Sequence, residues 1–259
     1  MSKEIELECP SGLRVRLRGI KGKDLDGLRD KRRVQTGEAF SRLLDECTLE
    51  VIDHGPYSKE GGWRWANALV GDRVRALIGV RVATSGTLYA FRARCSNEDC
   101  RAWIDWEVDM LDLPMKRLSA ESRATYLAGN RFETIVGEKL VTFHLTTGED
   151  QVRAFRKREQ VAASAKRQQR ESGSSESSGQ GQILLGLAMR IVEVEGEPDI
   201  VTFLGELDLG EVHRLSRAMD LADCGIETTI DIVCDKCSEV TSTELPLDAT
   251  FFRPVTTTT

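Results

Sequence analysis

The sequence lacks the patterns that mark most enzyme classes. It contains no Gly-rich phosphate loop, no Gly-x-Ser-x-Gly elbow and no His-Glu-x-x-His helix, and its three histidines are scattered. Acidic residues are plentiful, but Asp105, Glu107 and Asp109 alternate with apolar neighbours. That alternation is typical of the outward face of a strand and not of a convergent acid–base pair. We therefore expect a protein without enzymatic activity.

Long apolar runs and a strong charge of one sign are missing as well. No stretch approaches the roughly 20 apolar residues of a membrane span, and the first residues have no hydrophobic signal core. The 259 residues are 30% charged with a formal net charge of −6, which argues against a protein that coats nucleic acid or a membrane surface. Seven cysteines, an odd number without a secretory signal, indicate a reducing cytosol and thiols or metal ligands, not disulfides.

Four of the cysteines form two short turns that lie far apart in the sequence. Cys95 and Cys100 have the spacing Cys-x4-Cys, and Cys234 and Cys237 have the spacing Cys-x2-Cys. Apolar and polar residues alternate before each turn, over 87–94 and 226–233, and again after it, over 101–114 and 238–246. Period-two alternation bounded by turn residues predicts strands, so each cysteine pair should lie at the tip of a β-hairpin.

Two such tips together offer four thiolates, which is the ligand set of a closed tetrahedral zinc site. We expect one Zn²⁺ per chain, bound by Cys95, Cys100, Cys234 and Cys237, with a structural role because no coordination position is left open. Two alternatives stand beside it. The four cysteines could be small buried hydrophobic residues or free thiols. Cys234 and Cys237 could also be a redox pair, although such a pair normally opens a helix and here strands flank it.

The rest of the chain predicts an α+β fold, in which β-hairpins and a split four-cysteine zinc-ribbon-like module combine with packed amphipathic helices. Further hairpins are expected over 5–18 and 132–145, the first with Arg14, Arg16 and Arg18 on a solvated face opposite acidic residues. Residues 23–34, 38–51, 69–82, 118–129, 150–170, 183–192 and 209–221 are expected to be helical. Cys9, Cys47 and His144 are interpreted as core or strand residues without a chemical role.

A Ser/Gly-rich tract divides the sequence into three parts. Residues 1–160 form an N-terminal α+β region with the first cysteine hairpin, and residues 161–182 contain the end of a basic helix and the linker. Residues 183–259 contain a helical segment and the second cysteine hairpin. Because the zinc site takes one cysteine pair from each side of the linker, the metal should join the two halves.

Several short motifs are similar to a known family. They are the strand–Pro10-Ser11-Gly12–strand opening, the loop 54–57, the Gly71-Asp72-Arg73 helix, the strand 89–91 that leads into the cysteines, Trp106-Glu107-Val108-Asp109, and the closing Cys-x2-Cys with residues 251–254. Together they resemble the baseplate hub assembly proteins, or chaperones, of contractile-tailed (T-even-like) phages and related contractile injection systems. The resemblance implies a non-enzymatic role with hub and baseplate proteins as partners. It also implies a location in the host cytoplasm during assembly, or in the tail baseplate of the virion.

Two functions are therefore carried forward. The first is a structural assembly protein of a contractile tail, held together by zinc, with apolar partner surface exposed on the 183–192 helix and at Phe251 and Phe252. The alternative is a zinc-ribbon adaptor that binds nucleic acid or a transcription complex, favoured by the basic helix around 153–170. Glu98, Asp99 and Asp235 lie in the cysteine turns, where a nucleic-acid ribbon should carry Lys and Arg, so protein partners are preferred over nucleic acid.

Overall fold

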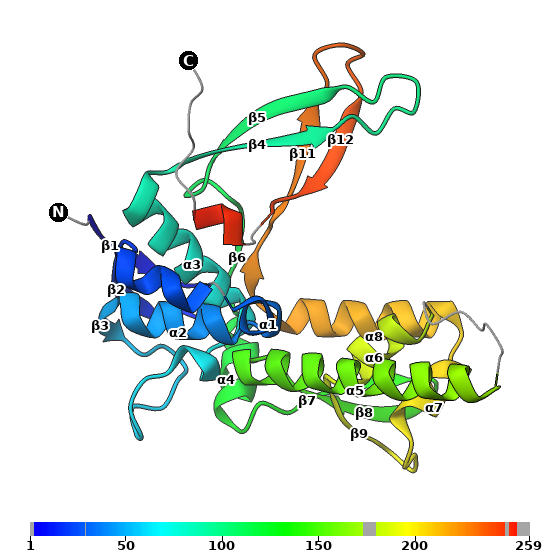
Figure 1. Ribbon diagram of the computed structural model, residues 1–259. Helices are drawn as coiled ribbons and strands as arrows, with labels where there is room; N and C mark the ends of the chain where they lie inside the picture. Colours follow the sequence, from blue (N-terminus) through cyan, green and yellow to red (C-terminus); the bar gives the residue numbers. More distant parts are fainter. Residues whose placement is uncertain (1–2, 29, 173–179, 247–248, 253–259) are drawn as a thin grey trace.

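The computed structural model describes residues 3–28, 30–172, 180–246 and 249–252. These residues form an α+β fold whose strand pairings are all antiparallel, which confirms the predicted class. Figure 1 shows a body of helices and small sheets from which four long strands project as a separate lobe. No helix in the described part of the chain is long and apolar enough to cross a membrane.

The first sheet is built from the predicted N-terminal hairpin and one later strand. Strands β1 (Glu4–Glu8), β2 (Arg14–Arg18) and β3 (Thr48–Asp53) lie in that order. The register places Glu6 opposite Arg16 and Glu8 opposite Arg14, as the acidic and basic rows predict. The predicted solvated arginine face is wrong at Arg18, whose guanidinium is buried and donates to Asp24 at 2.6 Å, because the segment after β2 folds over this corner of the sheet.

Two of the predicted helices in this region end earlier or divide. The 23–34 helix is a 3₁₀ segment, η1 (Gly22–Leu28), followed by α1 (Lys31–Thr36), whose first turn is capped by the Asp30 side chain. The 38–51 helix stops as α2 (Glu38–Cys47), because Thr48 begins the strand that pairs with β2. After the short segment η2 (Trp65–Asn67), the predicted 69–82 helix is confirmed as α3 (Val70–Ser85).

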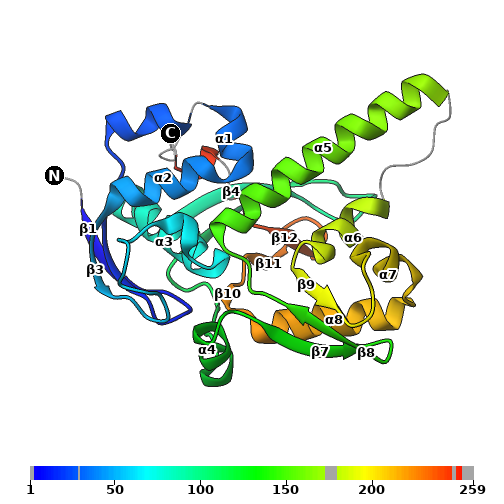
Figure 2. The same ribbon diagram turned by 90° about the horizontal axis from the view of Figure 1, so that it is seen from below.

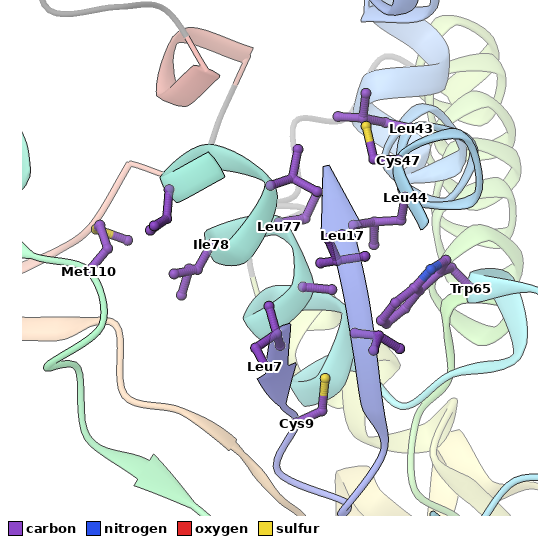
Figure 3. Packing of buried hydrophobic residues seen from close by; sticks show 14 of the residues in the cluster. Leu7, Cys9, Leu17, Leu43, Leu44, Cys47, Trp65, Leu77, Ile78 and Met110 are labelled. Atoms are coloured by element: carbon purple, nitrogen blue, oxygen red, sulfur yellow. The ribbon is translucent and has the colours of Figure 1, made fainter. Parts of the chain in front are cut away.

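The main core lies between this sheet and helices α2 and α3. Figure 3 shows Leu17 of β2 between Leu44 of α2 and Leu77 of α3, with Trp65 closing one side. Leu44, Trp65 and Ile78 are completely buried. This packing fixes α3, and the strand that follows α3 carries the first cysteine turn.

A second core is built around another three-stranded sheet. It contains β7 (Phe132–Val136), β8 (Lys139–Phe143) and β9 (Ile191–Val194), so the 132–145 hairpin is confirmed. The helices of this part are α4 (Ala120–Leu127), α5 (Gly148–Ser172), α6 (Gln180–Ala188), α7 (Ile200–Glu206) and α8 (Leu209–Ala222). The prediction of one helix over 183–192 is wrong at its end, because Ile191 enters β9 and pairs with Phe143.

The projecting lobe consists of the two cysteine hairpins, as the alternation predicts. One hairpin is β4 (Leu88–Arg94) with β5 (Trp103–Asp109), and the other is β11 (Thr229–Val233) with β12 (Val240–Glu244). Between lobe and body, β6 (Met115–Lys116) pairs with β10 (Gly225–Ile226). Figure 1 shows the two hairpins crossing in the part of the lobe near their tips, where Ile104 and Ile232 share a small core.

The aromatic pair near the end of the chain lies in the core, contrary to prediction. Phe251 and Phe252 belong to η3 (Ala249–Phe252) and are 1% and 5% exposed. The Phe251 ring lies 5.2 Å from the Tyr89 ring and 5.8 Å from the guanidinium of Arg81. The predicted exposed helix surface is also largely covered, since Leu185 of α6 is buried and its neighbours pack on the second core.

The central part of the predicted linker, residues 173–179, lies outside the described residues. Its flanks are helical, with residues 171–172 ending α5 and residues 180–182 beginning α6. Both cores draw residues from both sides of this tract. The first core includes Leu245 and Phe251, and the second combines Val141 with Leu204. The two halves of the sequence are therefore interleaved in the folded body.

Candidate metal centre

The two cysteine turns have similar backbone hydrogen bonds and dihedral angles. In the first turn the N–H of Cys95 donates to the carbonyl of Ala102 at 2.9 Å, and in the second the N–H of Cys234 donates to the carbonyl of Glu239 at 2.9 Å. The residue after the second cysteine of each turn, Arg101 or Ser238, has a positive φ, 43° and 61°. A left-handed residue is uncommon outside glycine, so its presence at equivalent positions indicates a matched local geometry that turns both thiols inward.

The structure brings together all four cysteines that the sequence predicts. The Sγ atoms of Cys95 and Cys237 are 3.5 Å apart, and those of Cys100 and Cys234 are 3.9 Å apart. All four sulfurs lie within 4.8 Å of one another, and none of these cysteines is in a disulfide. Cys95 and Cys234 are buried, Cys100 is half-buried and Cys237 is exposed. Four soft donors at this separation could hold a metal ion.

A small apolar core holds the two turns in register. Ile104 of β5 and Ile232 of β11 are buried between the hairpins, together with Ala102 and the first cysteine of each pair. Beside the sulfurs, the N–H of Ser96 donates to Oγ1 of Thr241 at 3.0 Å, and the two hydroxyls are 3.1 Å apart. Ser96 and Thr241 therefore tie one turn to the other hairpin directly. No sequence pattern predicts this contact, because neither residue belongs to a motif.

The hairpins are also joined at their base. Lys116 of β6 pairs with Gly225 of β10, and the N–H of Glu227 donates to the carbonyl of Pro114 at 2.8 Å. The side-chain ammonium of Lys116 reaches the carbonyls at the end of α8. The hairpins are thus joined at both ends of the lobe, by a backbone ladder next to the body and by the Ser96–Thr241 contact and small core near the tips, where the four sulfurs also meet.

The environment of the sulfurs favours a thiolate at one position. Backbone N–H groups of Lys236 and Cys237 point to the sulfur of Cys234 and lower its pKa to about 7. The sulfur of Cys237 accepts from the N–H of Glu239, which lowers its pKa, but partial desolvation and the three neighbouring thiols together raise that pKa to about 12. Metal ligation requires thiolates, and a bound cation would remove the repulsion that keeps the further thiols protonated.

Cys9 and Cys47 are placed where the sequence interpretation expects them, and Cys224, which that interpretation did not consider, is also buried. Cys9, Cys47 and Cys224 are buried in the two cores of the body. Burial raises the pKa of Cys9 well above its usual value and raises that of Cys47 to about 11, so these thiols are inert near neutral pH. The placement of His144 within the strand is wrong, because β8 ends at Phe143; the His144 ring lies against backbone carbonyls of Leu145 and Met189, with Nδ1 3.7 Å from the Asp150 carboxylate.

One exposed aromatic residue on the lobe was missed by sequence reasoning. Trp103 is 52% exposed, and the guanidinium carbons of Arg92 and Arg94 lie 5.3 Å and 4.7 Å from its ring centroid. Arg94 is the direct cross-strand partner of Trp103. The available signal was the alternation itself, which places Arg92, Arg94 and Trp103 on the outward face of the first hairpin.

Comparison of the chain with protein-family models, with curated proteins and with solved structures finds no significant match. The chemistry of the site is therefore argued from its own residues.

Proposed function

We propose that the four-cysteine cluster is a structural zinc site with one Zn²⁺ per chain. Sulfurs about 2.3 Å from a central ion at the corners of a tetrahedron are about 3.8 Å apart. The separations of 3.5 Å and 3.9 Å between paired Sγ atoms fit that arrangement, and this observation carries the proposal. Cys95, Cys100, Cys234 and Cys237 would fill all four positions, so the ion would supply stability and no open site for a substrate.

Metal content and thermal melting test this assignment. The chain purified without added metal should contain one equivalent of zinc, and a strong chelator should lower its melting temperature. Replacement of zinc by Co²⁺ should give the visible spectrum of a tetrahedral thiolate complex. A chain with no bound metal, four freely titrating thiols and an unchanged melt in chelator would overturn the assignment.

On the basis of the same site, we propose that the chain is a non-enzymatic assembly protein. The zinc would hold the two hairpins as one rigid arm, and a rigid arm that projects from a folded body suits a protein that positions other proteins. Trp and Arg are the residue types that dominate protein interfaces, and Trp103 with Arg94 supplies such a pair on the arm. On the resemblance described above, we propose hub and baseplate proteins of a contractile tail as the partners, met in the host cytoplasm or in the tail baseplate of the virion.

Binding to purified hub and baseplate proteins tests this role. We expect a stable complex in size-exclusion chromatography that is lost when chelator removes the metal or when Trp103 is replaced by Ala. The matched control is Val240→Ala on the outer face of the other hairpin, which is 55% exposed. If the metal-loaded chain forms no complex with any hub or baseplate component, the assembly role fails while the zinc site can stand.

A zinc-ribbon adaptor that binds nucleic acid remains the second candidate. It is favoured by the position of Arg92 and Arg94 around the exposed ring of Trp103, since cationic residues beside an aromatic ring suit single-stranded nucleic acid. It is opposed by the acidic row of Asp105, Glu107 and Asp109, which follows Trp103 on β5 and whose Asp105 pairs with Arg92 at 2.7 Å. Fluorescence anisotropy with single-stranded oligonucleotides decides between them. Tight binding that weakens steeply with salt and requires Trp103 would place nucleic acid first.

A further inference from the structure

A cavity lies outside the cysteine lobe, between helices α1, α2 and α5. Figure 2 shows the first half of α5 lying beside α1 and α2, and the elements are in contact. The cavity between them has a volume of about 550 Å³, within the range of small-molecule sites. Five arginines from separate parts of the chain line it: Arg33, Arg42, Arg64, Arg153 and Arg156.

The guanidinium groups around this cavity keep unused donors. Arg33 approaches Asp30 through Nε at 3.3 Å, and Arg42 approaches Glu46 through Nε at 3.0 Å. Their Nη groups are left for a ligand. The Arg64 carbonyl accepts from the N–H of Asn67, but its guanidinium has no hydrogen bond or ion pair among the described residues and acts on Asp45 only through its charge. Exposed ion pairs of this kind contribute little to stability, so an anion with a denser charge can compete for the same guanidinium groups.

A buried cation beneath the cavity adds to its positive charge. Arg73 of α3 is 3% exposed and donates only to neutral acceptors, among them Oγ of Ser41 at 2.8 Å and the carbonyl of Gly37 at 3.0 Å. Ser41 itself lines the cavity. The Nε of Arg73 is buried without a partner, and burial lowers the pKa of Arg73 only to about 10, so the group stays charged at neutral pH. In the part of the chain that the structure describes, no carboxylate forms an ion pair with Arg73, and Asp45 acts on it only through its charge.

The acidic residues that line the cavity are fewer than its arginines, although Asp30, Glu46 and Asp150 outside the lining pair with Arg33, Arg42 and Arg153. Glu38, Asp45 and Glu149 also line it, so arginines outnumber carboxylates five to three. Asp45 is already used as an acceptor by the N–H of Trp65 at 2.9 Å, and Glu38 pairs with Arg156. A cleft lined by excess charge of one sign concentrates ligands of the other sign.

We propose that this arginine cleft binds a small anion with several phosphate groups, such as a nucleoside di- or triphosphate or inorganic polyphosphate. The chain's own carboxylates already meet the arginines one at a time, so a single carboxylate on a ligand would gain little. A polyphosphate presents several dianionic groups within the span of one small molecule and can engage guanidinium groups from α1, α2 and α5 together.

Isothermal titration of the full-length, metal-loaded chain tests the proposal at low salt. ATP, sodium tripolyphosphate and inorganic phosphate are compared, each without added magnesium. We expect saturable one-site binding of ATP and tripolyphosphate and much weaker binding of inorganic phosphate. Equal affinities for ATP and tripolyphosphate would show that the phosphate groups alone determine binding. Tighter binding of ATP would show that the cleft also contacts the nucleoside.

Arg64→Gln and Arg33→Gln should each weaken binding about tenfold, because each removes a charged donor. Arg131→Gln and Arg214→Gln are the matched controls, since both arginines are exposed and paired with glutamate but lie outside the cavity. The proposal is overturned by an absence of binding at millimolar concentrations, or by control variants that weaken binding as much as the cleft variants do. Circular dichroism of each variant separates lost binding from lost folding.

Discussion

The sulfur of Cys95 lies 3.5 Å from the sulfur of Cys237, although 142 positions separate the two residues in the chain. One residue follows α3 and the first core, and the other follows α8 and the second core. A metal bound here would therefore connect two segments of the chain that emerge from different cores of the body. An ion at the site would close a very long loop. In the chain-entropy model, a cross-link stabilises a protein more when the loop that it closes is longer.

Replacement of a cysteine in the cluster should remove the metal and destabilise the fold. Cys100→Ser and Cys234→Ser each leave three thiolates, and we expect metal content to fall to near zero. With free metal a thousandfold above its Kd, loss of the site removes about 4 kcal/mol from the free energy of unfolding. Metal analysis and chemical denaturation measure both effects. Cys47→Ala, in the first core, is the control and should keep one equivalent of metal. Full metal content in either serine variant would contradict the four-ligand site.

The pair between Arg18 and Asp24 should make stability fall in acid. The hydrogen bond from Arg18 holds the pKa of Asp24 below its usual value, so the folded state favours the ionised carboxylate. That contribution is present above the unfolded pKa of about 3.9 and is lost as pH falls below it.

Asp24→Asn should cost about 3 kcal/mol near neutral pH, because it leaves a buried guanidinium without its counter-charge. Urea denaturation between pH 3 and 7 measures the difference, which should shrink toward the acid end. Glu46→Gln is the comparison, since its pair with Arg42 is exposed and should contribute under about 1 kcal/mol. Equal losses for the two variants would contradict a buried pair.

The close approach of α3 to β10 predicts a strong effect at one glycine. A Cβ at Gly71 would lie 2.3 Å from the carbonyl oxygen of Cys224 and 2.7 Å from Cα of Gly225, and neither backbone atom can move freely. Gly71→Ala should therefore destabilise the chain by about 1–3 kcal/mol. Gly225→Ala on the facing strand is the matched control, because its Cβ would meet nothing within 4 Å. Thermal melting of the two variants decides, and a Gly225→Ala effect as large as that of Gly71→Ala would be against the prediction.

Truncation of Phe251 should unfold part of the first core and not merely alter a surface. Its ring is enclosed by Tyr89, Phe252 and the guanidinium of Arg81. Phe251→Ala should cost about 3–5 kcal/mol in the free energy of unfolding, as for other buried phenylalanines. Val240→Ala, at an exposed position, should cost less than about 0.5 kcal/mol. A stable Phe251→Ala variant with weakened partner binding would restore the earlier interpretation of this segment as a docking surface.

Local periodicity predicted the cysteine hairpins because apolar and polar residues alternate over part of each hairpin, beside the turn residues. The alternation is clear next to the turns, over residues 91–94 and 230–232, and each turn between the strands is short. The same rule failed at Thr48, where a helical pattern continues into residues that pair with β2. A similar error occurred at Ile191. Its apolar neighbours are compatible with a helix, but Ile191 pairs with the edge of β8 and forms a strand. In both places, pairing with a strand distant in sequence decided whether the segment forms a helix or a strand.

The sequence by itself determined the α+β class, the two hairpins and the identity of the four sulfur donors, since these depend on residue type and short-range spacing. Tertiary structure alone decided that the four sulfurs meet within 4.8 Å, that Phe251 is buried and that five arginines converge on one cleft. The physical reason is that each of these features joins segments separated by many residues. Their mutual position follows from the packing of α2, α3 and α5 on two interleaved cores, and no short stretch of the chain carries that information.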